Sequence, residues 1–275
     1  MDQQNGKKRR KAAFITALVI FLIVLAGSIY YFATHGWDLF ALFHRGSADT
    51  AEGAETFKPV VTSAAIDSET DTPETEPPLP QNPVNFSAQM KINDEIYAWL
   101  YIPNTNVNYP ILQSKVDDLY YLRRDVHENY DISGVLFTQS VNNRNFKDPV
   151  TVIYGHNMTE YGTMFATLHN FEDAEFFENN DTFYIYTPGH ILTYKIVSAY
   201  KYDNRHIMNS FNFDDPEVRR EYFDYVLSPM AIPMNVREGA EIKDDDRLVV
   251  LSTCMTDNTY RFLVNGVLVK DEITK

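Results

Sequence analysis

The chain contains a single cysteine, Cys254, in the stretch VVLSTCMTDNTYRFLV. Strand-like residues flank MTDN on both sides, so we interpret MTDN as a turn. Antiparallel pairing about that turn places Cys254 opposite Arg261, with both side chains on one face. A guanidinium beside a thiol favours the thiolate and can donate hydrogen bonds to a developing oxyanion. This spacing indicates a cysteine nucleophile; the alternative is a buried, unreactive cysteine beside an exposed arginine.

A thiol nucleophile needs an acid–base partner, and histidine is the usual one. Among the seven histidines, His156 directly follows an apolar strand and a glycine in VTVIYGHNM. The ends of strands commonly present site residues on the loops that follow. We therefore select His156 as the acid–base. The remaining histidines are expected to be solvated or capping residues: His35, His44, His127, His169, His190 and His206.

The sequence offers no set of metal ligands. One cysteine and scattered histidines lack the usual ligand spacing, and KDDDR (243–247) is interpreted as a solvated turn and not a calcium site. We therefore expect no metal and no cofactor. Five basic residues and Asp2 give the first 11 residues a net charge of +4, which leaves −18 for the other residues. Such an acidic chain argues against binding to nucleic acid.

The N-terminus is typical of a membrane anchor. Residues 1–11 form a basic segment, and residues 12–33 contain no charged side chain. As a helix, this apolar run would be about 33 Å long, enough to cross a hydrocarbon core of about 30 Å. The basic segment is then expected in the cytoplasm and the rest of the chain outside. A cleaved signal peptide is the alternative, although its apolar region is usually only about 7–15 residues long.

Residues 34–85 are expected to form a membrane-proximal segment and a disordered stalk, because residues 46–85 are rich in Thr, Glu, Ala and Pro and have few large apolar side chains. Residues 86–275 have a normal size for one domain. A helix capped by Ser87 is predicted to continue through Ile96 and Leu100, and another spans Asp214 to Leu227. Strands are predicted at residues 134–138, 149–155, 181–187, 191–200, 247–253 and 260–269. Many short strands with few helices indicate a mainly antiparallel barrel.

These motifs resemble those of the class B sortases, membrane-anchored cysteine transpeptidases of Gram-positive cell surfaces. The segments WLYIPNTNVNYPIL, DDLYYL, GVLF, YGHNMTEYGTMF and the final Cys–Arg hairpin follow the family's order. The resemblance implies a mainly β fold, a sortase-like closed barrel of about eight strands. It further implies N-terminal helices and a helix before the penultimate strand.

The resemblance also implies roles for individual residues. Cys254 matches the nucleophile, His156 the acid–base, and Arg261 the residue that steadies the substrate and the oxyanion. Four further residues match positions that contact substrate: Ser252, Leu122, Ile207 and Asp118. Two residues depart from the family pattern, because Asp118 replaces a common asparagine and Val250 a common threonine. The change at Asp118 is expected to alter peptide preference.

A class B sortase would cleave a C-terminal sorting motif of secreted proteins, usually between Thr and Gly, through a thioacyl-enzyme. It would then transfer the acyl group to an amine of a peptidoglycan precursor or a pilin lysine. The expected partners are therefore secreted proteins with such a motif, the acceptor amine, and the membrane through the N-terminal helix. Two alternatives remain open. One is an inactive surface scaffold domain; the other is an enzyme like the L,D-transpeptidases, which keep histidine close before cysteine.

Overall fold

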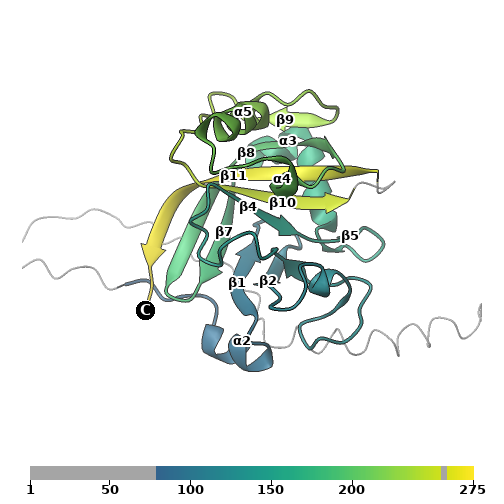
Figure 1. The fold of residues 1–275 in the computed structure, drawn as a ribbon, viewed down its shortest axis with the longest axis vertical. Helices are drawn as coiled ribbons and strands as arrows, with labels where there is room; N and C mark the ends of the chain where they lie inside the picture. Colours follow the sequence, from purple (N-terminus) through teal and green to yellow (C-terminus); the bar gives the residue numbers. More distant parts are fainter. Residues whose placement is uncertain (1–78, 255–258) are drawn as a thin grey trace, which may run out of the picture. The chain divides into compact units, whose positions relative to one another are not determined.

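The computed structural model of the protein describes residues 79–254 and 259–275. Within these residues eight strands close a barrel in the order β11-β10-β4-β3-β2-β1-β7-β8, with β8 pairing back to β11 (Figure 1). The strands are β1 (Ile96–Tyr101), β2 (Asn108–Leu112), β3 (Leu136–Phe137), β4 (Val150–Tyr154), β7 (Thr182–Thr187), β8 (His190–Asp203), β10 (Leu248–Cys254) and β11 (Tyr260–Ile273). The predicted closed, mainly β barrel is confirmed.

Most neighbouring strands are antiparallel, as predicted, but β2–β3 and β4–β10 are parallel pairs. Strand β9 (Met234–Val236) extends the sheet beside β8, and β5 (Asn157–Met158) forms a small hairpin with β6 (Thr163–Met164). The parallel pairing of β4 with β10 matters most for the site. Parallel strands end at the same edge of a sheet, so the residues that follow β4 lie beside the end of β10.

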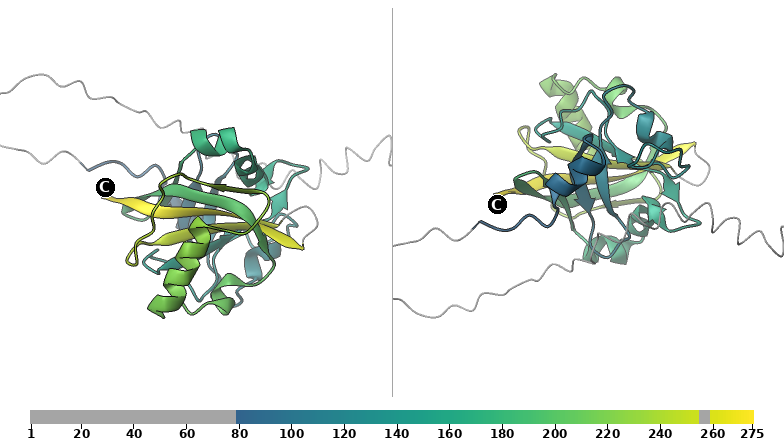
Figure 2. Two further views of the ribbon diagram at one scale, coloured as in Figure 1. Left: turned by 90° about the horizontal axis from the view of Figure 1, so that it is seen from above. Right: turned by 90° about the horizontal axis from the view of Figure 1, so that it is seen from below.

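The helices surround the barrel (Figures 1 and 2). They are α2 (Phe86–Ile92), α3 (Ala174–Asn179), α4 (Ile207–Ser210), α5 (Pro216–Leu227) and the 3-10 helices η1 (Tyr120–Arg123) and η2 (Ala166–Glu172). Helix α5 precedes the penultimate strand as predicted, and lies on the side of the domain opposite to α2. Its first turn begins with Asp215, whose carboxylate accepts from the backbone N–H of Glu217, followed by Pro216. This sequence starts a helix at that point because it satisfies a free N–H and presets the backbone.

The prediction for the first helix is partly wrong. Helix α2 is capped by Asn85, and it ends at Ile92. Residues Ile96 and Leu100, which were expected to continue it, are instead completely buried in strand β1. A separation of four residues places side chains on one face of a helix and also on one face of a strand, so the spacing did not distinguish the two.

Strand β10 is buried on both faces, which explains its continuous apolar run. Val249 and Leu251 belong to the cluster of side chains inside the barrel. Leu248 and Val250 belong to a second cluster on the outer face, which includes Phe223 of helix α5. Burying both faces of a central strand removes it from water and fixes the position of its end.

The predicted anchor at residues 12–33 lies outside the described residues. None of the helices in residues 79–254 and 259–275 is long and apolar enough to cross a membrane. The last residues assigned to the stalk contact the domain. The side chain of Asn82 donates to the carbonyl of Thr187 at 2.8 Å, and the backbone N–H of Lys275 donates to Pro80 at 3.0 Å.

Candidate active site

The end of the β10–β11 hairpin places the thiol beside a guanidinium. Cys254 is the last residue of β10, and it pairs with Arg261 of β11 in the antiparallel ladder. The pairing predicted from the position of the turn is therefore confirmed. Both residues are partly buried, whereas the preceding residue of β10, Thr253, is only 1% exposed. Alternation along the strand directs Ser252 and Cys254 to the face opposite Thr253.

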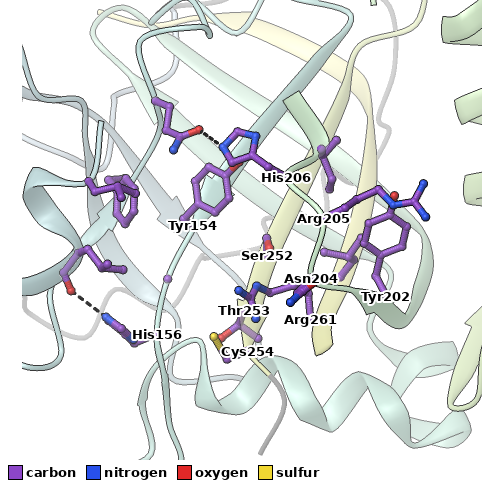
Figure 3. A pocket seen from close by; sticks show the side chains of 17 residues that line it. Tyr154, His156, Tyr202, Asn204, Arg205, His206, Ser252, Thr253, Cys254 and Arg261 are labelled. Carbon is purple, nitrogen blue, oxygen red and sulfur yellow. Dashed lines mark hydrogen bonds between the residues drawn. The ribbon is translucent and has the colours of Figure 1, made fainter. Parts of the chain in front are cut away.

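His156 reaches the same place from the neighbouring strand. In the parallel ladder Tyr154 lies opposite Ser252, and the backbone N–H of Gly155 donates to the carbonyl of Ser252 at 3.2 Å. Continuing this register by two residues places His156 at the level of Cys254. In Figure 3 the sulfur atom of Cys254 points to the side on which His156 lies.

Gly155 allows the chain to pass close to the core before His156. A Cβ atom at this position would lie 2.5 Å from Cδ2 of Leu136 and 2.6 Å from Cδ2 of Phe165. Both distances are shorter than normal van der Waals contacts. A larger residue would therefore displace the end of β4 and the histidine that follows it.

A hydrogen bond to the backbone determines which ring nitrogen of His156 carries the hydrogen. Its Nε2 lies 2.7 Å from the carbonyl oxygen of Leu122 in η1 (Figure 3). A carbonyl can only accept, so Nε2 carries the hydrogen. In the neutral ring Nδ1 then keeps its lone pair. The contact therefore both orients the ring and leaves Nδ1 as the nitrogen that can exchange a proton.

The three residues meet at one pocket of about 200 Å³. Leu122, Ile207 and Ser252, which the sequence placed at the substrate, line the pocket as well. Asp118 is not among the lining residues. Its exposed carboxylate accepts a hydrogen bond from the backbone N–H of Ser140 at 2.7 Å. The lining residues lie in or directly beside η1, β3, β4, the segment from the end of β8 to α4, β10 and β11: Leu119, Leu122, Phe137, Gln139, Tyr154, Gly155, His156, Tyr202, Asn204, Arg205, His206, Ile207, Ser252, Thr253, Cys254, Arg261 and Leu263.

Two tyrosines, Tyr154 and Tyr202, form part of the pocket wall. Burial raises the pKa of Tyr154 well above its usual range; the nearby carboxylate of Asp118 adds to this effect, and Arg261 opposes it. Burial likewise raises the pKa of Tyr202 to about 12. Both side chains therefore stay uncharged well into the alkaline range, and both line the pocket. The hydroxyl group of Tyr154 is itself buried, without a hydrogen-bond partner in the described part of the chain.

Polar contacts hold the segment that runs from the end of β8 to α4 and forms one wall of the pocket. The guanidinium of Arg205 forms an ion pair with Asp203, with Nη2 2.7 Å from Oδ2. His206 accepts from the backbone N–H of Asn209 through Nδ1 and contacts Oε1 of Gln139 through Nε2 at 2.6 Å. His206 is therefore a capping residue, as expected, and it also lines the pocket.

The expectation for His169 is wrong. It is neither solvated nor a cap, because its Nε2 lies 3.2 Å from the carbonyl oxygen of Cys254 and its ring stacks on Phe262. Asn157, directly after His156, donates to the same carbonyl at 3.1 Å. The sequence could have indicated a role for Asn157, because it directly follows His156 in the segment after β4. No local pattern connects His169, in a 3-10 helix, with a strand 85 residues later.

Comparisons with known proteins agree with this geometry. Residues 100–269 match the Sortase domain family. The curated Sortase B of Listeria monocytogenes is 33% identical over 184 residues, which cover 65% of this chain and 72% of that protein. The crystal structure of Clostridium perfringens sortase B is 27% identical, with a TM-score of 0.59, and the match covers 68% of this chain and 100% of that one.

A further solved structure is that of a Streptococcus pyogenes class B sortase involved in pilus biogenesis. It is 28% identical, with a TM-score of 0.57, and the match covers 68% of this chain and 98% of that one. The family match spans more than half of the chain, and the curated relative and the two solved structures named here are all of the B class. The chain therefore belongs to the sortase family, as a class B sortase, and is a cysteine transpeptidase.

Proposed function

We propose that Cys254 is the nucleophile of this transpeptidase, His156 its general acid–base, and Arg261 the residue that stabilises the oxyanion. The observation that carries this proposal is the meeting of all three side chains at one pocket, from three neighbouring strands of the barrel. A strand scaffold suits this chemistry, because the reacting groups must keep their relative positions while the substrate changes.

The first half of the reaction forms a thioester. The thiolate of Cys254 attacks the carbonyl carbon of the scissile peptide, and the negative charge that develops on the carbonyl oxygen faces the guanidinium of Arg261. The C–N bond then breaks, and the protonated imidazole of His156 gives its proton to the departing amine. The acyl group stays on the sulfur, and the C-terminal fragment leaves.

The second half transfers the acyl group. An incoming primary amine attacks the thioester carbonyl and loses a proton to His156, which is now neutral. The C–S bond breaks, a new amide bond forms, and the thiolate of Cys254 is regenerated. The balance of the two halves is one amide exchanged for another, so no oxidant, metal or nucleotide is consumed.

The proposed substrate is a secreted protein with a C-terminal sorting motif that is cleaved between Thr and Gly or a similar pair. The proposed acceptor is an amine of a peptidoglycan precursor or a pilin lysine. The relative from Streptococcus pyogenes, described as involved in pilus biogenesis, supports including a pilin among the acceptors. The basic segment and apolar run at residues 1–33 support an extracellular catalytic domain on a membrane anchor.

The experiment that tests this function uses the full chain and a pool of pentapeptides with Pro at the second and Thr at the fourth position. Intact mass is measured with and without a primary amine. An acyl adduct is expected on the wild type and not on Cys254→Ala, and the amine should remove it. His156→Ala should strongly slow formation of the adduct, whereas His127→Ala, which changes an exposed histidine outside the pocket, should not.

Acceptors are then compared on the acylated enzyme. A peptidoglycan stem peptide and a lysine-containing pilin peptide are added separately, and the faster one indicates the natural partner. If no peptide acylates the wild type and iodoacetamide does not alkylate Cys254 in the folded protein, the inactive scaffold becomes the better interpretation. An adduct that persists in Cys254→Ala would refute the assignment of the nucleophile.

A further inference from the structure

The carbonyl group of Cys254 lies beyond the last backbone pairing of β10 with β4. That parallel ladder ends at Ser252 and Tyr154, and the carbonyl of Ser252 accepts from Gly155 N–H. Carbonyls of alternate residues in a strand point to the same side, so the carbonyl of Cys254 points toward the chain that follows β4. The β4–β10 ladder has no backbone N–H paired with this carbonyl, and side chains contact it instead.

Two side chains meet this carbonyl oxygen. Nδ2 of Asn157 lies 3.1 Å from it, and Nε2 of His169 lies 3.2 Å from it. The two nitrogens are themselves 3.0 Å apart. The ring of His169 stacks on Phe262 with centroids 5.0 Å apart, and Nδ1 lies 2.5 Å from Oε1 of Glu172. The side chain of His169 is only 21% exposed.

The acceptors fix where the hydrogens lie. The carboxylate of Glu172 can only accept, so Nδ1 of His169 carries a hydrogen. The carbonyl of Cys254 also can only accept, so a bond from Nε2 requires a second hydrogen and a positively charged ring. The carboxylate of Glu172 contacts Nδ1 of the ring in either case. In the neutral ring, Nε2 instead accepts from Asn157, which still donates to the carbonyl.

We propose that His169, held by Glu172, is a positioning residue for the nucleophile of this transpeptidase. It fixes the peptide group of Cys254 at the point where pairing with β4 has stopped, so that the sulfur stays aligned with Arg261 and His156. Asn157 supports the same carbonyl from the strand side. This inference rests on the proposed role of Cys254 as nucleophile, and it adds Glu172–His169 as a support that touches neither substrate nor sulfur.

A single isotope label tests the contact directly. Because the chain has one cysteine, growth with [1-13C]cysteine labels one backbone carbonyl in the whole protein. Loss of a hydrogen bond moves a carbonyl carbon resonance upfield. In the full chain we expect an upfield shift of this signal in His169→Phe, which keeps an aromatic ring against Phe262, and a smaller shift in the same direction in Glu172→Gln.

His190→Phe is the matched control. His190 also contacts a carboxylate through Nδ1, that of Asp271 at 2.7 Å, but it lies at the start of β8 and is not among the residues that line the pocket. The cysteine signal should be unchanged in this variant. An unchanged signal in His169→Phe as well would overturn the proposed contact.

Reactivity tests the consequence for the nucleophile. The second-order rate of alkylation of Cys254 by iodoacetamide should fall about tenfold in His169→Phe, the equivalent of one hydrogen bond, and stay within about twofold in His190→Phe. Glu172→Gln should lower it less. The double variant should be no slower than His169→Phe, because Glu172 acts only through His169.

The possible outcomes separate this inference from the function on which it rests. Equal alkylation rates in His169→Phe and His190→Phe, or losses that multiply in the double variant, refute the positioning role and leave the nucleophile assignment intact. Acylation of Cys254→Ala by the pentapeptide pool refutes the nucleophile assignment. If His169→Phe does not fold, the isosteric Glu172→Gln decides alone, and an unchanged alkylation rate in it refutes the proposal.

Discussion

Arg261 faces Cys254 across the last described pair of the β10–β11 ladder, and this juxtaposition gives a prediction at the scale of one residue. Arg261→Ala should lower the rate of acyl-enzyme formation by about 10²–10³, the usual effect of removing one oxyanion donor. Arg261→Lys should fall between the wild type and the alanine variant, because an ammonium keeps the charge but loses the planar fork. The rates are measured by intact mass on the pentapeptide pool.

Arg123→Ala is the control for that change. Arg123 is an exposed residue of η1 directly after the pocket residue Leu122, and it is not itself among the lining residues. Its loss should change the rate by less than about twofold, as expected for an exposed charge. Equal losses at Arg123 and Arg261 would mean that general charge, and not a donor beside the thiol, assists the reaction.

Strand β4 carries the next prediction, because its end determines where His156 lies. Gly155→Ala should lower the free energy of unfolding by about 1–3 kcal/mol, since the new methyl group collides with Leu136 and Phe165. It should also lower the acylation rate per folded molecule, because relief of the collision moves the residue that follows. Denaturant titration and the acylation assay measure the two effects separately.

Gly266→Ala separates stability from activity in the same assays. A Cβ atom at Gly266 would collide with Phe183, which lies in the cluster inside the barrel. Neither residue lines the pocket. This variant should therefore lose stability but keep the acylation rate of its folded fraction. If Gly155→Ala keeps that rate as well, the end of β4 does not control the histidine.

Helix α5 covers the outer face of the barrel, and its cap gives a third prediction. Asp215→Ala removes the carboxylate that accepts from Glu217 N–H at 2.9 Å. It should lower the free energy of unfolding by about 1 kcal/mol. The acylation rate should not change, because neither residue lines the pocket. Asp214→Ala, one residue earlier and also exposed, should leave stability nearly unchanged, and a similar loss in both variants would contradict the cap.

The elements also indicate which features a sequence can reveal. The pairing of Cys254 with Arg261 was predictable because a short hairpin has a fixed symmetry about its turn. The strand at Ile96 was not, because its apolar spacing also fits a helix. His169 was missed for a different reason. Its contact with Cys254 depends on how η2 packs against the β10–β11 hairpin. Packing between segments so far apart in the chain produces no recognisable pattern of residue spacing in the sequence.

At the scale of the whole molecule, buried phenols link stability to alkaline pH. Burial raises the pKa of four buried tyrosines well above the usual value of about 10: Tyr97, Tyr194, Tyr200 and Tyr222. In the unfolded chain these four tyrosines ionise near pH 10, whereas in the folded domain their burial keeps them protonated at that pH. The stabilisation is therefore complete below about pH 10 and is lost as the pH rises above it.

Each such phenol lowers the free energy of unfolding by about 1.4 kcal/mol per pH unit above 10, so four of them remove a typical stability within about two units. We expect the part of the tyrosinate absorbance at 295 nm that comes from these four buried phenols to appear together with the loss of far-UV circular dichroism. Tyr222→Phe should move the transition to higher pH, because its hydroxyl has no hydrogen-bond partner in the described part of the chain and its loss removes one titrating group. Full tyrosinate absorbance at pH 10 with native dichroism would show that the phenols ionise inside the fold, and that burial does not protect them.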